Sequence, residues 1–260
     1  MPFVTLITDF GTSDGYVGEV KGAILSEEPG ANLVDVAHDV PPGDVEAAAW
    51  ILSRVWHRYP TGTVHLVVVD PGVGGARRAL AMESGGRWFV GPDNGVVSRA
   101  LGENEPDAVW ELDPDRCAPG TLSSTFHGRD LFAPAAARIL AGADPAALGD
   151  PVESESLRRL DLVFPTRRRD CVRGHVAHVD RFGNLVTDIP ASWVSPSALT
   201  ELSGVEISGV RLSYTSVEPG QLVAVIGSAG TLEISVREGS AAERLSARRG
   251  EPVLVRPERD

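Results

Sequence analysis

The pattern of apolar runs changes once along the chain, near residue 165. Before that point, short β-branched runs alternate with helix-forming segments; the runs lie at 3–8, 32–36, 64–69 and 88–90, and the segments at 16–26, 45–59 and 130–141. After it, only short alternating runs follow, at 175–180, 185–189, 205–214, 222–226, 232–236 and 252–256. Strands that alternate with helices predict an α/β domain whose mostly parallel sheet is flanked by helices. Short strands with regular turns predict a smaller all-β domain, a barrel or a sandwich.

Two domains are therefore expected in these 260 residues. We place the N-terminal α/β domain at residues 1–165 and the C-terminal β-barrel domain at residues 168–260, with the Arg-rich segment 167–169 in the linker. An apolar fraction of 42% is enough for a packed core in each domain.

Charge excludes several partners. The chain has 24 Lys and Arg against 36 Asp and Glu, a net charge of −12. Because phosphates attract basic surfaces, we expect no nucleic-acid partner and no anionic membrane partner. The N-terminal run lacks a basic segment before it and meets Asp9 early, so it does not look like a signal peptide. With no long apolar stretch, these features predict a cytoplasmic protein.

Polar clusters follow three of the expected strands in the first half. They are Thr8-Asp9, Asp70-Pro71-Gly72 and Pro92-Asp93-Asn94-Gly95. In open α/β sheets, ligands gather beyond the carboxyl ends of strands. Asp and Asn are also common turn residues, so each cluster alone fits a turn as well as a site. Three clusters in one half of the chain favour a site.

A glycine-rich loop at 72–78 follows Asp70 and carries Arg77. The loop lacks the Gly-Lys-Ser/Thr of a phosphate-binding loop, and Arg77 stands where the dinucleotide fingerprint needs glycine. We interpret it as a loop that returns Arg77 to Asp70, where the cation would keep the carboxylate ionised. The alternative is a solvated arginine on a mobile loop.

A second cluster, STFHGRD at 124–130, places His127 just before a helix, where it can face a cleft or serve only in packing. A metal site from Asp9, Asp14, His38 and Asp39 has no recognised ligand spacing. We therefore expect no metal and no cofactor.

Six motifs together resemble one family. They are TDFGTSDGYVGEVKG at 8–22, VVVDPGVGGARR at 67–78, GPDNG at 91–95, STFHGRD at 124–130, DRFGN at 180–184 and GSAGTLEIS at 227–235. In this order they are similar to the S-adenosyl-L-methionine hydroxide adenosyltransferases, the hydrolase branch of the fluorinase and chlorinase superfamily. The resemblance covers nearly the whole chain.

The resemblance implies a reaction and an assembly. Water and S-adenosyl-L-methionine would give adenosine and L-methionine by attack at C5′ of the ribose. The fold would be an α/β domain followed by a β-barrel, in a homotrimer with the ligand between the N-terminal domain of one subunit and the barrel of its neighbour.

Residue roles also follow from the resemblance, by motif position. Asp70, Arg77 and His127 match the hydrolase triad. Asp9 matches the residue that holds the ribose hydroxyls, and Asp14 and Asp180 match the residues at the methionine end. The adenine side is matched by Asn184 and Ser228, with Phe182 packing in the same pocket. Glu233 and the backbone near Val236 fall in a loop that closes over the adenine.

The chemistry suits these residue types. Displacement at C5′ expels neutral methionine, so the leaving group needs no acid, but neutral water is a poor nucleophile. A carboxylate and an imidazole can orient water and accept its proton, while a guanidinium stabilises the developing hydroxide. The residue types do not decide which of Asp70 and His127 holds the proton.

Three other functions fit parts of the sequence. A halogenase would need a site without a negative charge, and the halogenases carry an uncharged residue at the position of Asp70. Two positions depart from the halogenase pattern: Ala229 stands where they have Arg, which removes one contact to the methionine carboxylate, and Tyr16 stands where fluorinases have a small hydroxyl residue. A sensor of S-adenosyl-L-methionine or adenosine would need no triad. A metal-dependent hydrolase would use the Asp cluster and would lose activity with EDTA.

Overall fold

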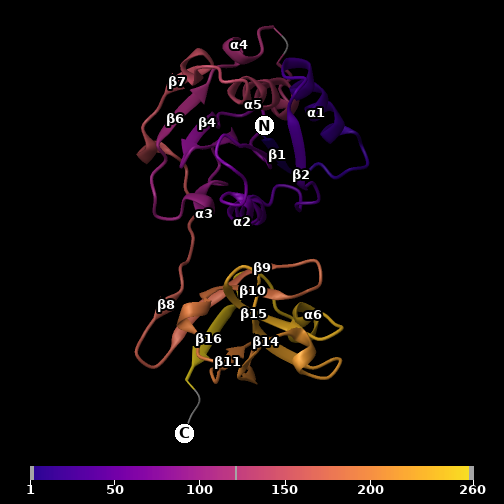
Figure 1. The fold of residues 1–260 in the computed structure, drawn as a ribbon, viewed down its shortest axis with the longest axis vertical. Coiled ribbons are helices and arrows are strands. Elements are labelled where there is room, and N and C mark those ends of the chain that lie inside the picture. Colours follow the sequence, from indigo (N-terminus) through magenta and orange to yellow (C-terminus); the bar gives the residue numbers. More distant parts are fainter. Residues whose placement is uncertain (1–2, 121, 258–260) are drawn as a thin grey trace. The chain divides into compact units, whose positions relative to one another are not determined.

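The computed structural model describes residues 3–120 and 122–257. The chain divides into two compact units, Met1–Leu160 and Asp161–Asp260 (Figure 1). Within the described ranges, no helix is long and apolar enough to cross a membrane.

The first unit contains a seven-stranded sheet in the order β2-β1-β3-β5-β4-β6-β7. Its strands are β1 (Phe3–Thr8), β2 (Asn32–Ala37), β3 (Val64–Val68), β4 (Ala79–Ser84), β5 (Arg87–Pro92), β6 (Ala108–Leu112) and β7 (Gly149–Pro151). β1 pairs in parallel with β2 and β3, and β3 with β5. The pairs β4–β5, β4–β6 and β6–β7 are antiparallel.

This sheet is therefore mixed, and the expectation of a mostly parallel sheet is not confirmed. The sequence analysis found β1, β2, β3 and β5 but not β4, β6 and β7. β4 reads Ala-Leu-Ala-Met-Glu-Ser, without a β-branched residue, and it forms because it pairs between β5 and β6.

Helices cover both faces of the sheet (Figure 1). Along β3, Leu66 packs in one core with α1 (Tyr16–Glu27) and α5 (Ala133–Leu140), and Val67 packs in the other with α2 (Val45–Val55) and α3 (Ser98–Leu101). This alternation is the two-residue period of a strand that is buried on both faces.

Local signals explain the ends of these helices. Asp44 caps α2, because its carboxylate accepts a bond from the Ala47 amide. α2 ends at Val55, although a helix as far as Tyr59 was expected. The segment expected as one helix at 130–141 starts as a π-turn, η1 (Gly128–Phe132), and continues as α5. The unit also contains α4 (Pro114–Cys117) and the 3₁₀ turns η2 (Pro145–Ala147) and η3 (Ser154–Ser156).

The second unit is a curved, mostly antiparallel sheet in the order β12-β11-β16-β9-β10-β15-β14-β13, with β8 beside β9 and one parallel pair, β13–β14. Its strands are β8 (Thr166–Arg167), β9 (Val172–Val179), β10 (Leu185–Pro190), β11 (Leu199–Leu202), β12 (Val205–Ser208), β13 (Val210–Arg211), β14 (Leu222–Ile226), β15 (Thr231–Val236) and β16 (Pro252–Arg256). The turns η4 (Ala191–Trp193) and η5 (Tyr214–Ser216) and helix α6 (Ala241–Leu245) complete the unit.

This second sheet curls back on itself like a barrel. β9 pairs with β16 through its first half and with β10 through its second half. β12 and β13 lie at opposite ends of the strand order, yet only Gly209 separates them in the chain. The run expected as one strand at 205–214 is split at this glycine. The Arg-rich segment expected as a linker forms the β8–β9 hairpin instead, with Arg168 N bonded to Cys171 O at 2.8 Å.

Candidate active site

The carboxyl ends of β1 and β3 place two candidate acids at one edge of the first sheet. Thr8 pairs with Val68 across these parallel strands, so Asp9 and Asp70 follow neighbouring strand ends. The Asp9 Oδ2 atom accepts a bond from Gly43 N at 2.8 Å. Gly43 in turn faces Pro71, the residue after Asp70. This edge is the usual ligand edge of a parallel sheet.

Asp70, Arg77 and His127 form one hydrogen-bonded cluster. Arg77 Nε donates to both carboxylate oxygens of Asp70, at 3.1 and 3.0 Å, and Arg77 Nη2 donates to Oδ2 at 2.5 Å. The same Nη2 lies 2.8 Å from His127 Nδ1. The Asp70 and Arg77 side chains are 5% and 8% exposed, so water screens this ion pair weakly. Phe132 lies under the guanidinium carbon at 5.2 Å, which adds a cation–π contact.

The bond from Arg77 fixes the protonation of His127. A guanidinium can only donate, so Nδ1 must accept and the neutral ring carries its proton on Nε2. Burial lowers the pKa of His127, and the Arg77 charge lowers it further, against opposing effects of Asp70 and Asp130. His127 is therefore a neutral ring that offers an N–H at Nε2.

Close packing holds the loop that carries Arg77. Gly74 has a φ of 74°, and a Cβ there would collide with the carbonyl oxygen of Ser124. Gly128 packs against Val68 and Phe10, and a Cβ would crowd both. The loop at 70–77 and the segment at 124–128 thus meet over the sheet edge.

An aromatic cluster that the sequence analysis missed lies beside this edge. Phe10, Tyr16 and Phe126 contact one another edge to face, with centroids 5.4 to 6.2 Å apart. Tyr16 is 48% exposed. Each ring belongs to one of the quoted motifs, but only the fold shows that the rings meet. Asp14 is exposed in the loop before α1.

The second unit contains a cavity of about 870 Å³ that holds four of the predicted site residues: Asp180, Phe182, Asn184 and Val236. Phe182 is 72% exposed, which is unusual for a phenylalanine and leaves one ring face for a ligand. The cavity volume suits a ligand of nucleoside size or larger.

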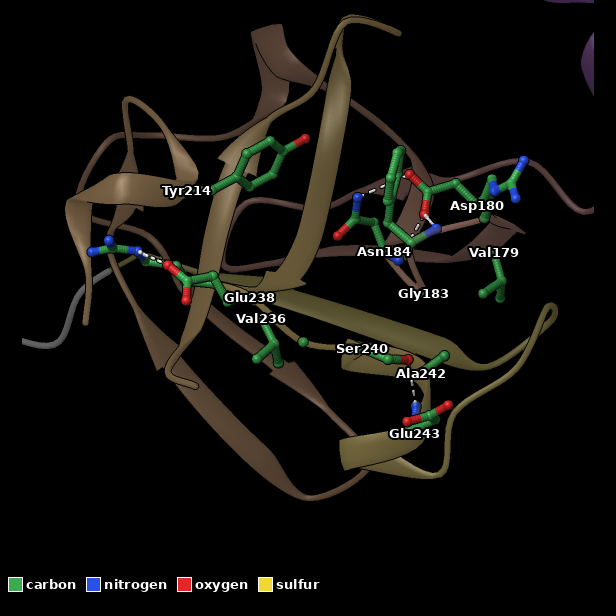
Figure 2. Close-up of a pocket in the computed structure, with 14 residues that line it drawn as sticks. Val179, Asp180, Gly183, Asn184, Tyr214, Val236, Glu238, Ser240, Ala242 and Glu243 are labelled. Carbon is green, nitrogen blue, oxygen red and sulfur yellow. Dashed lines mark hydrogen bonds and ion pairs between the residues drawn. The ribbon is translucent and has the colours of Figure 1, made fainter. Parts of the chain in front are cut away.

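Asp180 organises the turn at 180–184. Its Oδ1 accepts bonds from Phe182 N and Asn184 N, both at 2.9 Å, and its Oδ2 accepts one from Asn184 Nδ2 at 2.8 Å (Figure 2). The amide of Asn184 is therefore held with its oxygen turned away from Asp180, and that oxygen can accept from a ligand. In this state Asp180 supports Asn184.

Glu233 and Val236 lie on strand β15, and not in a loop as the sequence analysis expected. Both residues pair within the sheet, Glu233 with β10 and both with β14. Glu233 is buried, and its Oε1 accepts from Tyr214 at 2.7 Å and from Ser235 at 3.0 Å. Ser228 and Glu233 are not among the cavity's lining residues.

Tyr214 lines the same cavity, and sequence reasoning missed it (Figure 2). It is 44% exposed and sits in the short turn η5. Its bond to Glu233 raises the pKa of the phenol to about 12. The ring is thereby fixed at the cavity wall as a hydrogen-bond donor to Glu233. No motif includes Tyr214, so no sequence signal marks it.

The described residues hold no group of three or more His, Cys, Asp and Glu side chains arranged to bind a metal ion. Instead of joining Asp9 and Asp14, His38 bonds to Thr8 at 2.9 Å and to Asp35 at 3.0 Å. The four residues considered for a metal are therefore not brought together as ligands.

Comparison with known families gives a match in each unit. Residues 4–149 match the SAM hydroxide adenosyltransferase N-terminal domain, and residues 174–254 match the C-terminal domain of the same family. Among solved structures, an uncharacterised conserved protein from Thermotoga maritima is 34% identical with a TM-score of 0.90, over 97% of this chain and 99% of that one.

Relatives named as hydrolases match over nearly the full length. The (R)-S-adenosyl-L-methionine hydrolase of Thermus thermophilus is 42% identical over 97% of this chain and 98% of its own. The hydrolase of the same name from Salinispora tropica is 38% identical over 98% and 97%. A fluorinase from an Actinoplanes species is more distant, at 26% identity over 98% and 97%. Two matched domains and these relatives show that the chain belongs to the SAM hydroxide adenosyltransferase family.

Proposed function

We propose that this protein hydrolyses S-adenosyl-L-methionine to adenosine and L-methionine, with Asp70, Arg77 and His127 activating the water. The observation that carries the proposal is the buried cluster in which Arg77 bonds to both Asp70 and a neutral His127. Its near-full-length relatives named as hydrolases support the activity.

The hydrogen bonds suggest a separate role for each residue. Nε2–H of His127 donates to the attacking water and orients it. The Asp70 carboxylate keeps lone pairs beyond those used by Arg77, and it takes the proton that the water loses. Arg77 holds the Asp70 carboxylate in place through its hydrogen bonds and stabilises the developing hydroxide. As the new C5′–O bond forms, the C5′–S bond breaks, and its electron pair stays on sulfur in neutral methionine.

The substrate would occupy both units. The cavity of the second unit takes the adenine, with Asn184 on the adenine side and Phe182 against the ring, and Ser228 would contact the adenine from outside the cavity lining. Asp9 receives the ribose hydroxyls, while Asp14 and Asp180 serve the methionine end. Glu233 acts through Tyr214, and Val236 contributes to the cavity wall. Following the family resemblance, the two halves of each site come from neighbouring subunits of a homotrimer. A cytoplasmic location stays a prediction from the sequence.

The names of the relatives point to a finer substrate, the R epimer at sulfur. We therefore expect turnover of (R)-S-adenosyl-L-methionine in preference to the S epimer. The test uses an epimer mixture and a pure S sample, with adenosine and methionine followed by HPLC. Equal rates on both samples would remove the epimer preference but leave the hydrolase.

Single substitutions test the triad. Asp70→Asn and His127→Ala should lower kcat by about 10²- to 10⁴-fold, which is the usual contribution of acid–base groups. Adenosine affinity should stay within about twofold, because the cavity is built by other residues. Asp161→Asn and His57→Ala, both exposed, are the matched controls. Wild-type turnover in either triad variant would refute that residue's role.

Mixing two inactive variants tests the shared site. Asp70→Asn disables the first unit, and Asn184→Ala disables the cavity of the second. If the halves come from different subunits, refolded mixed oligomers contain some sites with two intact halves and regain activity. If each chain supplies its whole site, mixtures stay inactive.

A further inference from the structure

The turn at 92–95, between β5 and α3, bonds to the chain at both ends of the loop that carries the triad acid and arginine. That loop runs from Asp70 to Arg77, so Val69 and Arg78 flank it. The sequence analysis marked Asp93 and Asn94 as a third polar cluster at the sheet edge, and the mechanism above uses neither.

Asn94 holds the first end of the loop. Its Nδ2 donates to the carbonyl oxygen of Val69 at 2.8 Å, and its Oδ1 accepts from Val96 N at 3.2 Å. Val69 is fully buried and directly precedes Asp70. The Asn94 side chain thus holds the peptide group between Val69 and Asp70 in place.

Asp93 holds the second end. Its Oδ2 accepts from Arg78 Nε at 2.9 Å and from Nη2 at 2.7 Å, and its backbone N donates to Arg78 O at 3.0 Å. Asp93 is only 4% exposed, so this ion pair is weakly screened. Arg78 directly follows Arg77, which leaves that arginine little freedom to shift along the strand.

The turn is itself tied down. Asp93 Oδ1 accepts from Arg158 N at 2.9 Å, and Arg78 Nη2 also donates to Ser156 O at 2.6 Å. These bonds join the turn to the end of the first unit. Both oxygens of the buried Asp93 carboxylate therefore accept hydrogen bonds from within the protein.

We infer that Asp93 and Asn94 are positioning residues that set the separation of Asp70 and Arg77, and we name this pair the 93–94 brace. The inference rests on the catalytic roles proposed for Asp70 and Arg77. Neither brace residue touches the reacting atoms; each acts through the residue beside a triad member. A displacement of about 1 Å in such a pair can lower the rate by about 10²-fold.

The chain offers matched controls for both brace residues. Asn104 Nδ2 also donates to a backbone carbonyl, that of Leu101, at 3.1 Å. Asp107 Oδ2 accepts from Gly85 N at 2.7 Å, in the turn at the other end of the β4–β5 hairpin. The variants Asn104→Ala and Asp107→Asn alter hydrogen bonds to the backbone away from the loop; Asp107, unlike Asp93, is exposed.

The experiment compares Asn94→Ala and Asp93→Asn with these controls in the full-length protein. We measure kcat, KM, adenosine affinity and the ¹⁵N spectrum of labelled histidine, in which the Nδ1 signal of His127 reports its bond from Arg77. The brace predicts kcat lower by about 10- to 100-fold, a shifted His127 signal, and KM and adenosine affinity within about twofold. Both controls should match the wild type. Asp93→Asn preserves the side-chain shape, so it carries the test if Asn94→Ala does not fold.

Three results would overturn the inference: wild-type kcat in both brace variants, an equal loss in the controls, or an unshifted His127 signal together with a lower kcat. The proposed function fails differently, because a wild-type protein without hydrolysis would refute it whatever the variants do. The histidine spectrum tests the geometry in either case.

Discussion

Acidification should destabilise the first unit through one buried histidine, His65. It lies on β3, the strand that leads to Asp70, and is completely buried. Its Nδ1 lies 2.7 Å from the hydroxyl of Thr5, its ring stacks on Trp56 with centroids 4.9 Å apart, and its Nε2 has no hydrogen-bond partner. A proton added to the ring would place a charge in the core, where burial opposes it more strongly than the Trp56 backbone favours it.

The size of the effect follows from the pKa. Burial lowers the pKa of His65 from 6.5 to about 4. Between these values the unfolded chain binds a proton that the folded chain does not, so stability falls as the pH falls through this window. Within this window, each pH unit changes the free energy of unfolding by about 1.4 kcal/mol. The free energy of unfolding therefore falls by about 3 kcal/mol from pH 6.5 to pH 4. Above pH 6.5 the contribution of His65 is constant.

Urea unfolding at pH 7.0 and pH 4.5, followed by tryptophan fluorescence, measures this loss. The variant His65→Gln keeps a polar group for Thr5 but cannot titrate. It starts less stable at pH 7.0 because it loses the Trp56 contact, so the comparison uses the change with pH. We expect that change to be smaller than in the wild type by about 2 to 3 kcal/mol. The same pH dependence in His65→Gln and wild type would refute the reasoning.

Three further predictions follow from the site. Gly74→Ala should lower the free energy of unfolding by about 1–3 kcal/mol and also lower kcat, because alanine disfavours the φ of 74° and would collide with Ser124. Urea unfolding and kinetics measure both effects, and unchanged stability with unchanged kcat would contradict the packing. Tyr214→Phe should weaken adenosine binding measured by calorimetry, since the ring loses the bond that fixes it to Glu233; unchanged affinity would remove Tyr214 from the site. EDTA should leave turnover unchanged, as the activated water needs no metal; a loss that zinc or magnesium restores would favour a metal-dependent hydrolase.

The sequence predicted the parts of the fold that depend on local signals. β1 and β3 are largely apolar, β-branched runs followed by acids, and the segment expected at 45–59 gave the start of α2 correctly. β4 could not be predicted because its Ala, Leu and Met residues favour a helix as much as a strand, and only its neighbours decide. Between Val55 and Pro60 no residue type forces a helix to stop, so the end of α2 was also missed.

The candidate site also has residues that local sequence motifs predict and residues that only contacts between distant segments reveal. Asp70, Arg77 and His127 lie in motifs, and the return of Arg77 to Asp70 was expected from the glycine-rich loop at 72–78. Tyr214 and the 93–94 brace depend on contacts between distant segments, such as the bond from Tyr214 to Glu233. The family resemblance implied a loop at Glu233, whereas the apolar run at 232–236 predicted the strand in which pairing with β10 and β14 holds it.

The measurement that tests the central claim most directly is turnover of S-adenosyl-L-methionine in ¹⁸O-labelled water with chloride and EDTA present, read by mass spectrometry. Water attack at C5′ predicts adenosine with one ¹⁸O at the 5′ position and an equal amount of unlabelled methionine. A 5′-chloro nucleoside, or adenosine without the label, would contradict the account.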